Sequence, residues 1–97
     1  MSVIKFNLNN EIRRISVQKQ PTFEEVSEIL NRLYGSKLAN VTFALRYVDS
    51  EGDLVTVSST EELEEAFRNF TDRPTARFSV IPIEKEDEGT YIVNPRF

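Results

Sequence analysis

Carboxylates concentrate in one stretch of this 97-residue chain, residues 47–67, which reads YVDSEGDLVTVSSTEELEEAF. The stretch holds seven Asp and Glu residues and no Lys or Arg. Its first acidic group, at 49–53, includes Ser and Gly and is typical of a turn. Its second group opens a helix, where Ser59 and Glu62 have capping-box spacing. A strand-like LVTVSST segment separates the groups, so folding strand and helix together would place both on one negative surface.

Basic residues are concentrated in the other half of the chain. Residues 1–48 carry seven Lys and Arg against four acids, whereas residues 49–97 carry five against twelve. The net charges are therefore +3 and −7, and together they give the overall −4. Such an asymmetry indicates a partner recognised through charge. A solvated surface whose charges segregate by chance is the plainer alternative.

The hydrophobic pattern predicts seven elements in the order ββαββαβ. Two alternating segments joined by Asn9-Asn10 predict a hairpin. Thr22 and Glu25 have capping-box spacing at the start of an amphipathic helix, and Gly35 is suited to end it. This order is typical of an α+β, ubiquitin-like β-grasp roll with one mixed sheet and two helices. The expected segments are strands 3–8 and 12–17, helix 22–35, strands 41–48 and 54–57, helix 59–69 and strand 77–83.

We expect one domain over residues 1–83 and an acidic linker with a short apolar tail over 84–97. Within that tail, Tyr91-Ile92-Val93 is apolar enough for an extra strand or a docking segment. No Cys is present, and the N-terminus has no long apolar run. We therefore expect a cytoplasmic protein without disulfides, signal peptide or membrane contact.

Two sets of residues give this chain a resemblance to a known family. The acidic turn Asp49-x-Glu51-Gly52-Asp53, a seven-residue spacer and Glu61-Glu62 resemble the acidic OPCA motif of PB1 domains. The resemblance covers about residues 2–83 and includes the element order. Within the family, EIRRISV and DSEGDLVTVSSTEEL are most similar to sequestosome-type selective-autophagy receptors, although kinase and polarity adaptors share the motifs. One departure is Thr60, where an acid often precedes the Glu pair.

The basic counterpart in PB1 domains is a Lys on the first strand and a basic pair on the second. Lys5 and Arg13-Arg14 match it here. Successive strand residues face opposite sides, so only one of the two Arg side chains can share the face of Lys5.

The resemblance implies an interaction module of the mixed type, with an acidic and a basic face. PB1 domains bind front to back, so the expected partner is a second copy or another PB1-type domain. We expect a salt-sensitive homo-oligomer, an open polymer among the options, in a scaffold, autophagy receptor or signalling adaptor. The expected acidic face is Asp49, Glu51, Asp53, Glu61 and Glu62, and the expected basic face is Lys5, Arg13 and Arg14.

Other functions fit the residues less well. Asp49, Glu51 and Asp53 have calcium-loop spacing, but that loop needs Gly and Glu where this chain has Leu54 and Thr60. The chain has no His or Cys, the usual bases and nucleophiles, so we expect no enzyme and no catalytic, metal or cofactor-binding residue. A pI near 4.9 argues against nucleic-acid binding. Edge-strand pairing with another protein, such as a small GTPase, is the main rival.

Overall fold

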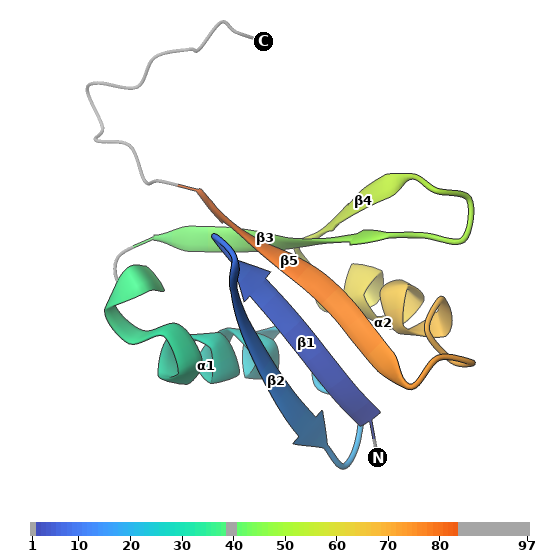
Figure 1. Ribbon diagram of the computed structural model, residues 1–97, viewed down its shortest axis with the longest axis horizontal. Helices are drawn as coiled ribbons and strands as arrows, with labels where there is room; N and C mark the ends of the chain where they lie inside the picture. Colours follow the sequence, from blue (N-terminus) through green and yellow to red (C-terminus); the bar gives the residue numbers. More distant parts are fainter. Residues whose placement is uncertain (1, 39–40, 84–97) are drawn as a thin grey trace, which may run out of the picture.

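Five strands form one mixed sheet in the order β2-β1-β5-β3-β4 (Figure 1). The computed structural model describes residues 2–38 and 41–83. The central strands β1 and β5 are parallel, and the other three neighbouring pairs are antiparallel. The strands are β1 (Ser2–Leu8), β2 (Glu11–Val17), β3 (Thr42–Val48), β4 (Leu54–Val57) and β5 (Thr75–Ile83).

The first hairpin turns at two asparagines. Asn9 and Asn10 both have positive φ, 50° and 72°. Two consecutive residues of this kind make a type I′ turn, whose twist suits a two-residue hairpin. Asn tolerates this backbone conformation better than most residues. The turn therefore fixes the register that pairs Lys5 with Arg14 across β1 and β2.

Both helices cover the same side of the sheet, the far side in Figure 1. Helix α1 (Phe23–Tyr34) begins with a complete capping box: Thr22 Oγ1 accepts from Glu25 N at 3.1 Å, and Glu25 Oε1 accepts from Thr22 N at 2.9 Å. A short 3₁₀ helix (Gly35–Leu38) follows it, and α2 is Thr60–Arg68. The helices pack on alternate strand residues, so one sheet face is buried and the other is open. The buried core includes Ile4, Phe6, Leu8, Val26, Leu30, Leu45, Val57, Leu63 and Phe78.

The expected β-grasp fold and element order are confirmed. The predicted boundaries differ by one or two residues; β5, for example, starts at Thr75 rather than Arg77. The expected linker and the Tyr91–Val93 segment lie outside the described residues. Among the helices that are described, none is long and apolar enough to cross a membrane.

Candidate functional site

The acidic turn between β3 and β4 is closed by its own first residue. Asp49 Oδ1 accepts from the backbone N–H groups of Glu51 and Asp53, each at 2.9 Å. Gly52 N donates to Asp49 O at 3.0 Å, and Gly52 has a φ of 85°, which strongly favours glycine. The loop thus presents three carboxylates whose oxygens lie within 4.8 Å of one another, those of Asp49, Glu51 and Asp53.

This turn does not have the surroundings of an EF-hand. Strands β3 and β4 flank it, whereas an EF-hand loop lies between two helices. One oxygen of Asp49 is already occupied by two N–H donors. None of the three carboxylates makes an ion pair with a described Lys or Arg. The turn therefore concentrates negative charge that no described neighbour neutralises.

The second acidic group follows the other end of β4, and one of its residues takes part in capping α2. Ser59 Oγ accepts from Glu62 N at 3.2 Å as the N-cap. The Glu62 carboxylate accepts from Ser58 N at 2.7 Å. That hydrogen bond is the main reason that the pKa of Glu62 is lowered. Glu61 is exposed beside it in the first turn of the helix. Ser59 is therefore the N-cap that the sequence predicts, and the place of Glu62 on the interaction face stays a prediction.

The end of α2 approaches the acidic turn. Ser50 N lies 3.4 Å from its acceptor Asn69 Oδ1, which follows the last turn of α2. Burial raises the pKa of Tyr47, and the charges of Asp49 and Glu65 raise it further. The negative charges of Glu65 and of Asp49 in the turn therefore act on the same side chain. Because α2 runs back along β4, the end of the helix lies by the first acidic group; that Glu61 and Glu62 belong to the same acidic face stays a prediction.

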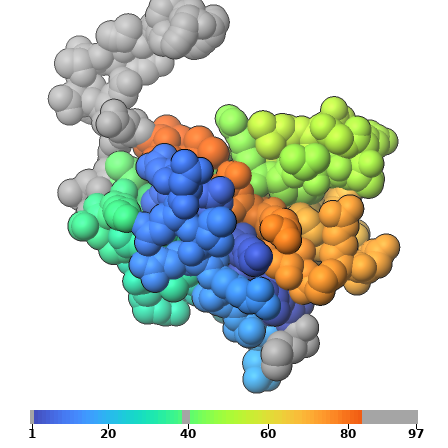
Figure 2. All heavy atoms as spheres, in the orientation of Figure 1, coloured from blue at the N-terminus to red at the C-terminus, as the bar shows by residue number. Residues whose placement is uncertain are grey.

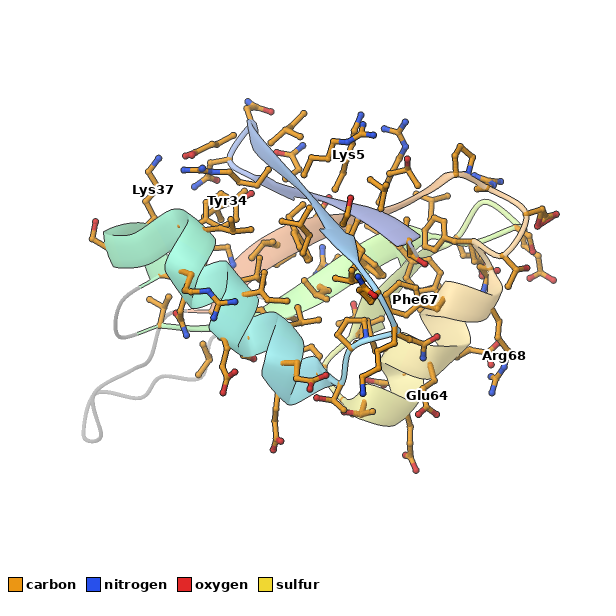
Figure 3. All side chains as sticks on the ribbon, turned by 90° about the horizontal axis from the view of Figure 1, so that it is seen from below. Lys5, Tyr34, Lys37, Glu64, Phe67 and Arg68 are labelled. Carbon is orange, nitrogen blue, oxygen red and sulfur yellow. The ribbon has the colours of Figure 1, made fainter. Side chains whose placement is uncertain are left out.

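On the basic side, Lys5 and Arg14 lie in one row on the open face. Their Cα atoms are partners across β1 and β2, and Arg77 of β5 is the partner of Lys5 on the other side. Directly opposed residues project from the same face of a sheet. Figure 3 shows Lys5 on the side away from the helices, whereas Glu64 projects from α2 on the helical side. Sequence reasoning missed Arg77, because nothing local indicates that β5 adjoins β1.

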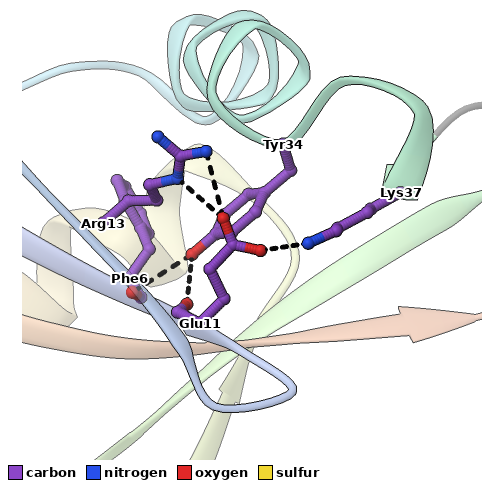
Figure 4. Close-up of polar contacts among 5 residues, drawn as sticks. All are labelled: Phe6, Glu11, Arg13, Tyr34 and Lys37. Atoms are coloured by element: carbon purple, nitrogen blue, oxygen red, sulfur yellow. Dashed lines mark hydrogen bonds and ion pairs between the residues drawn. The ribbon is translucent and has the colours of Figure 1, made fainter.

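Arg13 faces the opposite way. It is the partner of the buried Phe6, so it projects toward the helices. Its guanidinium contacts Glu11 at 3.0 Å and lies 5.7 Å from the centre of the Tyr34 ring (Figure 4). Glu11 also pairs with Lys37, and this contact is the main reason that the pKa of Glu11 is lowered. Tyr34 fixes the cluster to β2 by donating to Glu11 O at 2.9 Å.

The open face carries a uniform charge over the described strands. The register places four cations on it, Lys5, Arg14, Arg46 and Arg77. No Asp or Glu occupies an open-face position in β1 to β5. None of the four cations makes an ion pair with a described residue. Adjacent like charges cost on the order of 1 kcal/mol in water, so an anionic partner would relieve this repulsion.

A model of the PB1 domain family matches residues 2–81 of this chain. The chain belongs to the PB1 domain family. PB1 domains are interaction modules, and the resemblance inferred from the two motifs is confirmed. The match covers both helices and all of the described strands except the last two residues of β5.

Two solved structures share the fold. One is the AtNBR1-PB1 domain, with a TM-score of 0.68, 16% identity, and coverage of 84% of this chain and 97% of that one. The other is a cryo-EM structure of the AtNBR1-PB1 filament (L-type), with a TM-score of 0.67, 18% identity and the same coverage. At this identity they establish the architecture of the PB1 domain, and the interacting residues must be argued from the chain itself.

Thr60, which stands where PB1 domains often have an acid, has a structural role in this domain. Thr60 Oγ1 accepts from Phe23 N at 2.9 Å. Phe23 is the first residue of α1, whose leading N–H groups have no acceptor within their own helix. Thr60 thus joins the N-termini of the two helices. A carboxylate at this position would bring a negative charge to a site that a neutral hydroxyl already satisfies.

Proposed function

We propose that this PB1 domain associates front to back, with the acidic turn of one copy bound to the open face of the next. One observation carries the proposal: a face with four cations and no described carboxylate, on a domain whose acidic turn lacks a described cation. The binding residues on the basic side are Lys5, Arg14 and Arg77. On the acidic side they are Glu51 and Asp53, with Asp49 shaping the turn and Glu61 flanking it.

The strength of such a contact comes from the number of ion pairs. A single exposed pair contributes about 0–1 kcal/mol, because water and salt screen it. Several pairs formed together, with guanidinium groups binding carboxylates bidentately, can reach a micromolar dissociation constant, roughly −8 kcal/mol. High salt should dissolve such an interface.

The geometry of the contact determines what assembles. The two faces consist of different residues, so the interface is heterologous, and each bound copy leaves one face free. Such contacts produce open chains unless the rotation closes a ring. That the AtNBR1-PB1 domain was solved as a filament supports an open chain. We infer that the module polymerises a selective-autophagy receptor or a signalling adaptor.

Light scattering coupled to size-exclusion chromatography tests this proposal. We would measure mass from about 10 to 200 μM protein, at about 50 and 500 mM salt, where the screening length differs roughly threefold. We expect a mass that rises with concentration at low salt and falls to the 11.2 kDa monomer at high salt. A monomer under all conditions would contradict self-association. An oligomer that persists at high salt would instead favour pairing through an edge strand, β2 or β4.

A further inference from the structure

A groove crosses the open face at the point where β3 leaves β5. The two strands pair only as far as Arg46 and Ser79, and the β3–β4 hairpin then diverges (Figure 1). The groove encloses about 290 Å³. Figure 2 views this face, where β2, β1, β5 and the hairpin are exposed side by side. Its lining therefore comes from several strands and not from the acidic turn.

The lining combines cations with exposed apolar side chains. Lys5, Arg46, Arg73 and Arg77 all line it, so its charged groups are all basic. Only four large hydrophobic residues are exposed in the described chain, and three of them line this groove. They are Ile12 at 59%, Val48 at 59% and Leu54 at 61%. An anion alone would leave these apolar groups in water, so the complementary ligand is an acidic peptide with large apolar side chains.

The sequence of the chain itself contains such a peptide. Residues 84–93 read EKEDEGTYIV: four carboxylates and one Lys, followed by three consecutive large apolar residues. They follow directly on β5, the strand that supplies Arg77 and Ser79 to the groove. We propose that residues 84–93 bind the groove of their own domain, with the carboxylates near Arg46 and Arg77 and Tyr91-Ile92-Val93 on the apolar side chains.

The chain length allows this contact. From Ile83 back to Arg77, β5 is about 20 Å long at roughly 3.3 Å per residue. The eight residues from Glu84 to Tyr91 reach about 26 Å when extended. A segment that turns back after Ile83 can therefore cross Ser79 and bring Tyr91 to the groove. Its acidic residues, which reach about 17 Å from Ile83, can then lie beside Ser79 and its partner Arg46, and the apolar residues follow them.

Bound there, the segment competes with a second copy for Lys5 and Arg77, a consequence that rests on the proposed function. A short tether supplies a local concentration of about 1 mM or more. A segment whose intrinsic dissociation constant is about 0.1–0.5 mM would then leave only about a tenth to a third of the grooves free. Because the apparent dissociation constant rises as the free share falls, association should be weakened about three- to tenfold.

The test uses two variants of the 97-residue chain, and each variant has one of its two faces disabled. Asp53→Arg removes the acidic face and keeps the groove, and Arg13→Glu with Arg14→Glu removes the basic face. We would titrate the Arg13→Glu, Arg14→Glu protein into the Asp53→Arg protein. The Asp53→Arg protein is used with its natural tail and as a tail variant that also carries Glu86→Gln, Asp87→Asn and Glu88→Gln. A matched control carries Glu24→Gln, Glu28→Gln and Asp72→Asn, three exposed acids outside the groove. We expect about three- to tenfold tighter binding for the tail variant and less than about twofold for the control.

A second variant removes the apolar residues at constant charge: Tyr91→Ser, Ile92→Ser and Val93→Ser. This variant should also bind the second protein more tightly. A long-range charge effect would not explain that gain, because the charge of the tail is unchanged. Amide NMR shifts of Arg46, Arg77 and Ser79 in monomeric Asp53→Arg protein should change with either tail variant. Equal binding with and without the tail changes, or shifts that depend on protein concentration, would overturn the inference. If no complex forms in any titration, front-to-back association fails, while the NMR shifts still decide whether the tail binds.

Discussion

Arg13 and Arg14 are neighbours in the chain but project from opposite faces of β2. Arg14 lies opposite Lys5 on the open face, and Arg13 lies opposite the buried Phe6. Arg13 is therefore paired with Glu11 beneath the sheet edge, whereas Arg14 makes no ion pair with a described residue. This division gives Arg13 a partner within the domain and leaves Arg14 beside Lys5 on the open face.

We predict that Arg14→Glu weakens self-association at least about tenfold, a change of roughly 1.4 kcal/mol. Arg13→Gln should weaken it less, because its guanidinium is already committed to Glu11 and the Tyr34 ring. Its cost should instead be a small loss of stability, up to about 1 kcal/mol. Sedimentation and urea denaturation of both variants would check this. Equal losses of association would show that Arg13 also binds the partner.

Arg77 should contribute to binding although it belongs to no basic motif of the sequence. It is the Cα partner of Lys5, so a negative side chain there would oppose the incoming acidic turn. We expect Arg77→Glu to weaken association about as much as Arg14→Glu. Arg32→Glu is the matched control, since Arg32 is exposed on α1, on the helical side of the sheet. A loss as large in the control would indicate a general charge effect.

Glu11→Gln should strengthen association at low salt. Glu11 holds Arg13 and Lys37 and is the acid nearest to the basic residues of β2. Neutralising it removes repulsion of the acidic turn and releases Arg13, so we expect severalfold tighter binding. Unchanged affinity in Glu11→Gln would mean that this cluster is remote from the interface.

The cap of α2 should make stability depend on pH. The folded pKa of Glu62 is lowered, mainly by the Ser58 N–H, so its stabilising contribution is present at neutral pH and lost as the pH falls through that pKa. Glu62→Gln should therefore be less stable than wild type at neutral pH, and the difference should shrink in acid. Ser59→Ala should cost about 1 kcal/mol by removing the N-cap. Chemical denaturation at pH 7 and in acid measures both effects, and a difference that grows in acid would contradict this account.

Local signals predicted the fold well. The alternation in β1 and β2, the Asn9-Asn10 turn and the Thr22–Glu25 capping box each depend on residues close in sequence. The site was less predictable because it depends on long-range pairing. The parallel pairing of β5 with β1 brings Arg77 beside Lys5, and the direction of α2 brings Glu65 toward the acidic turn. Only the register across the sheet could assign Arg14 to the open face.

Mixing two disabled proteins tests the front-to-back interface most directly. We expect Asp53→Arg alone, and Arg13→Glu with Arg14→Glu alone, to remain folded monomers at low salt. Mixed, they retain one intact acidic turn and one intact open face, so light scattering should show a heterodimer of twice the 11.2 kDa chain mass and nothing larger. High salt should separate it. A mixture that stays monomeric, or single variants that associate like the wild type, would contradict the account.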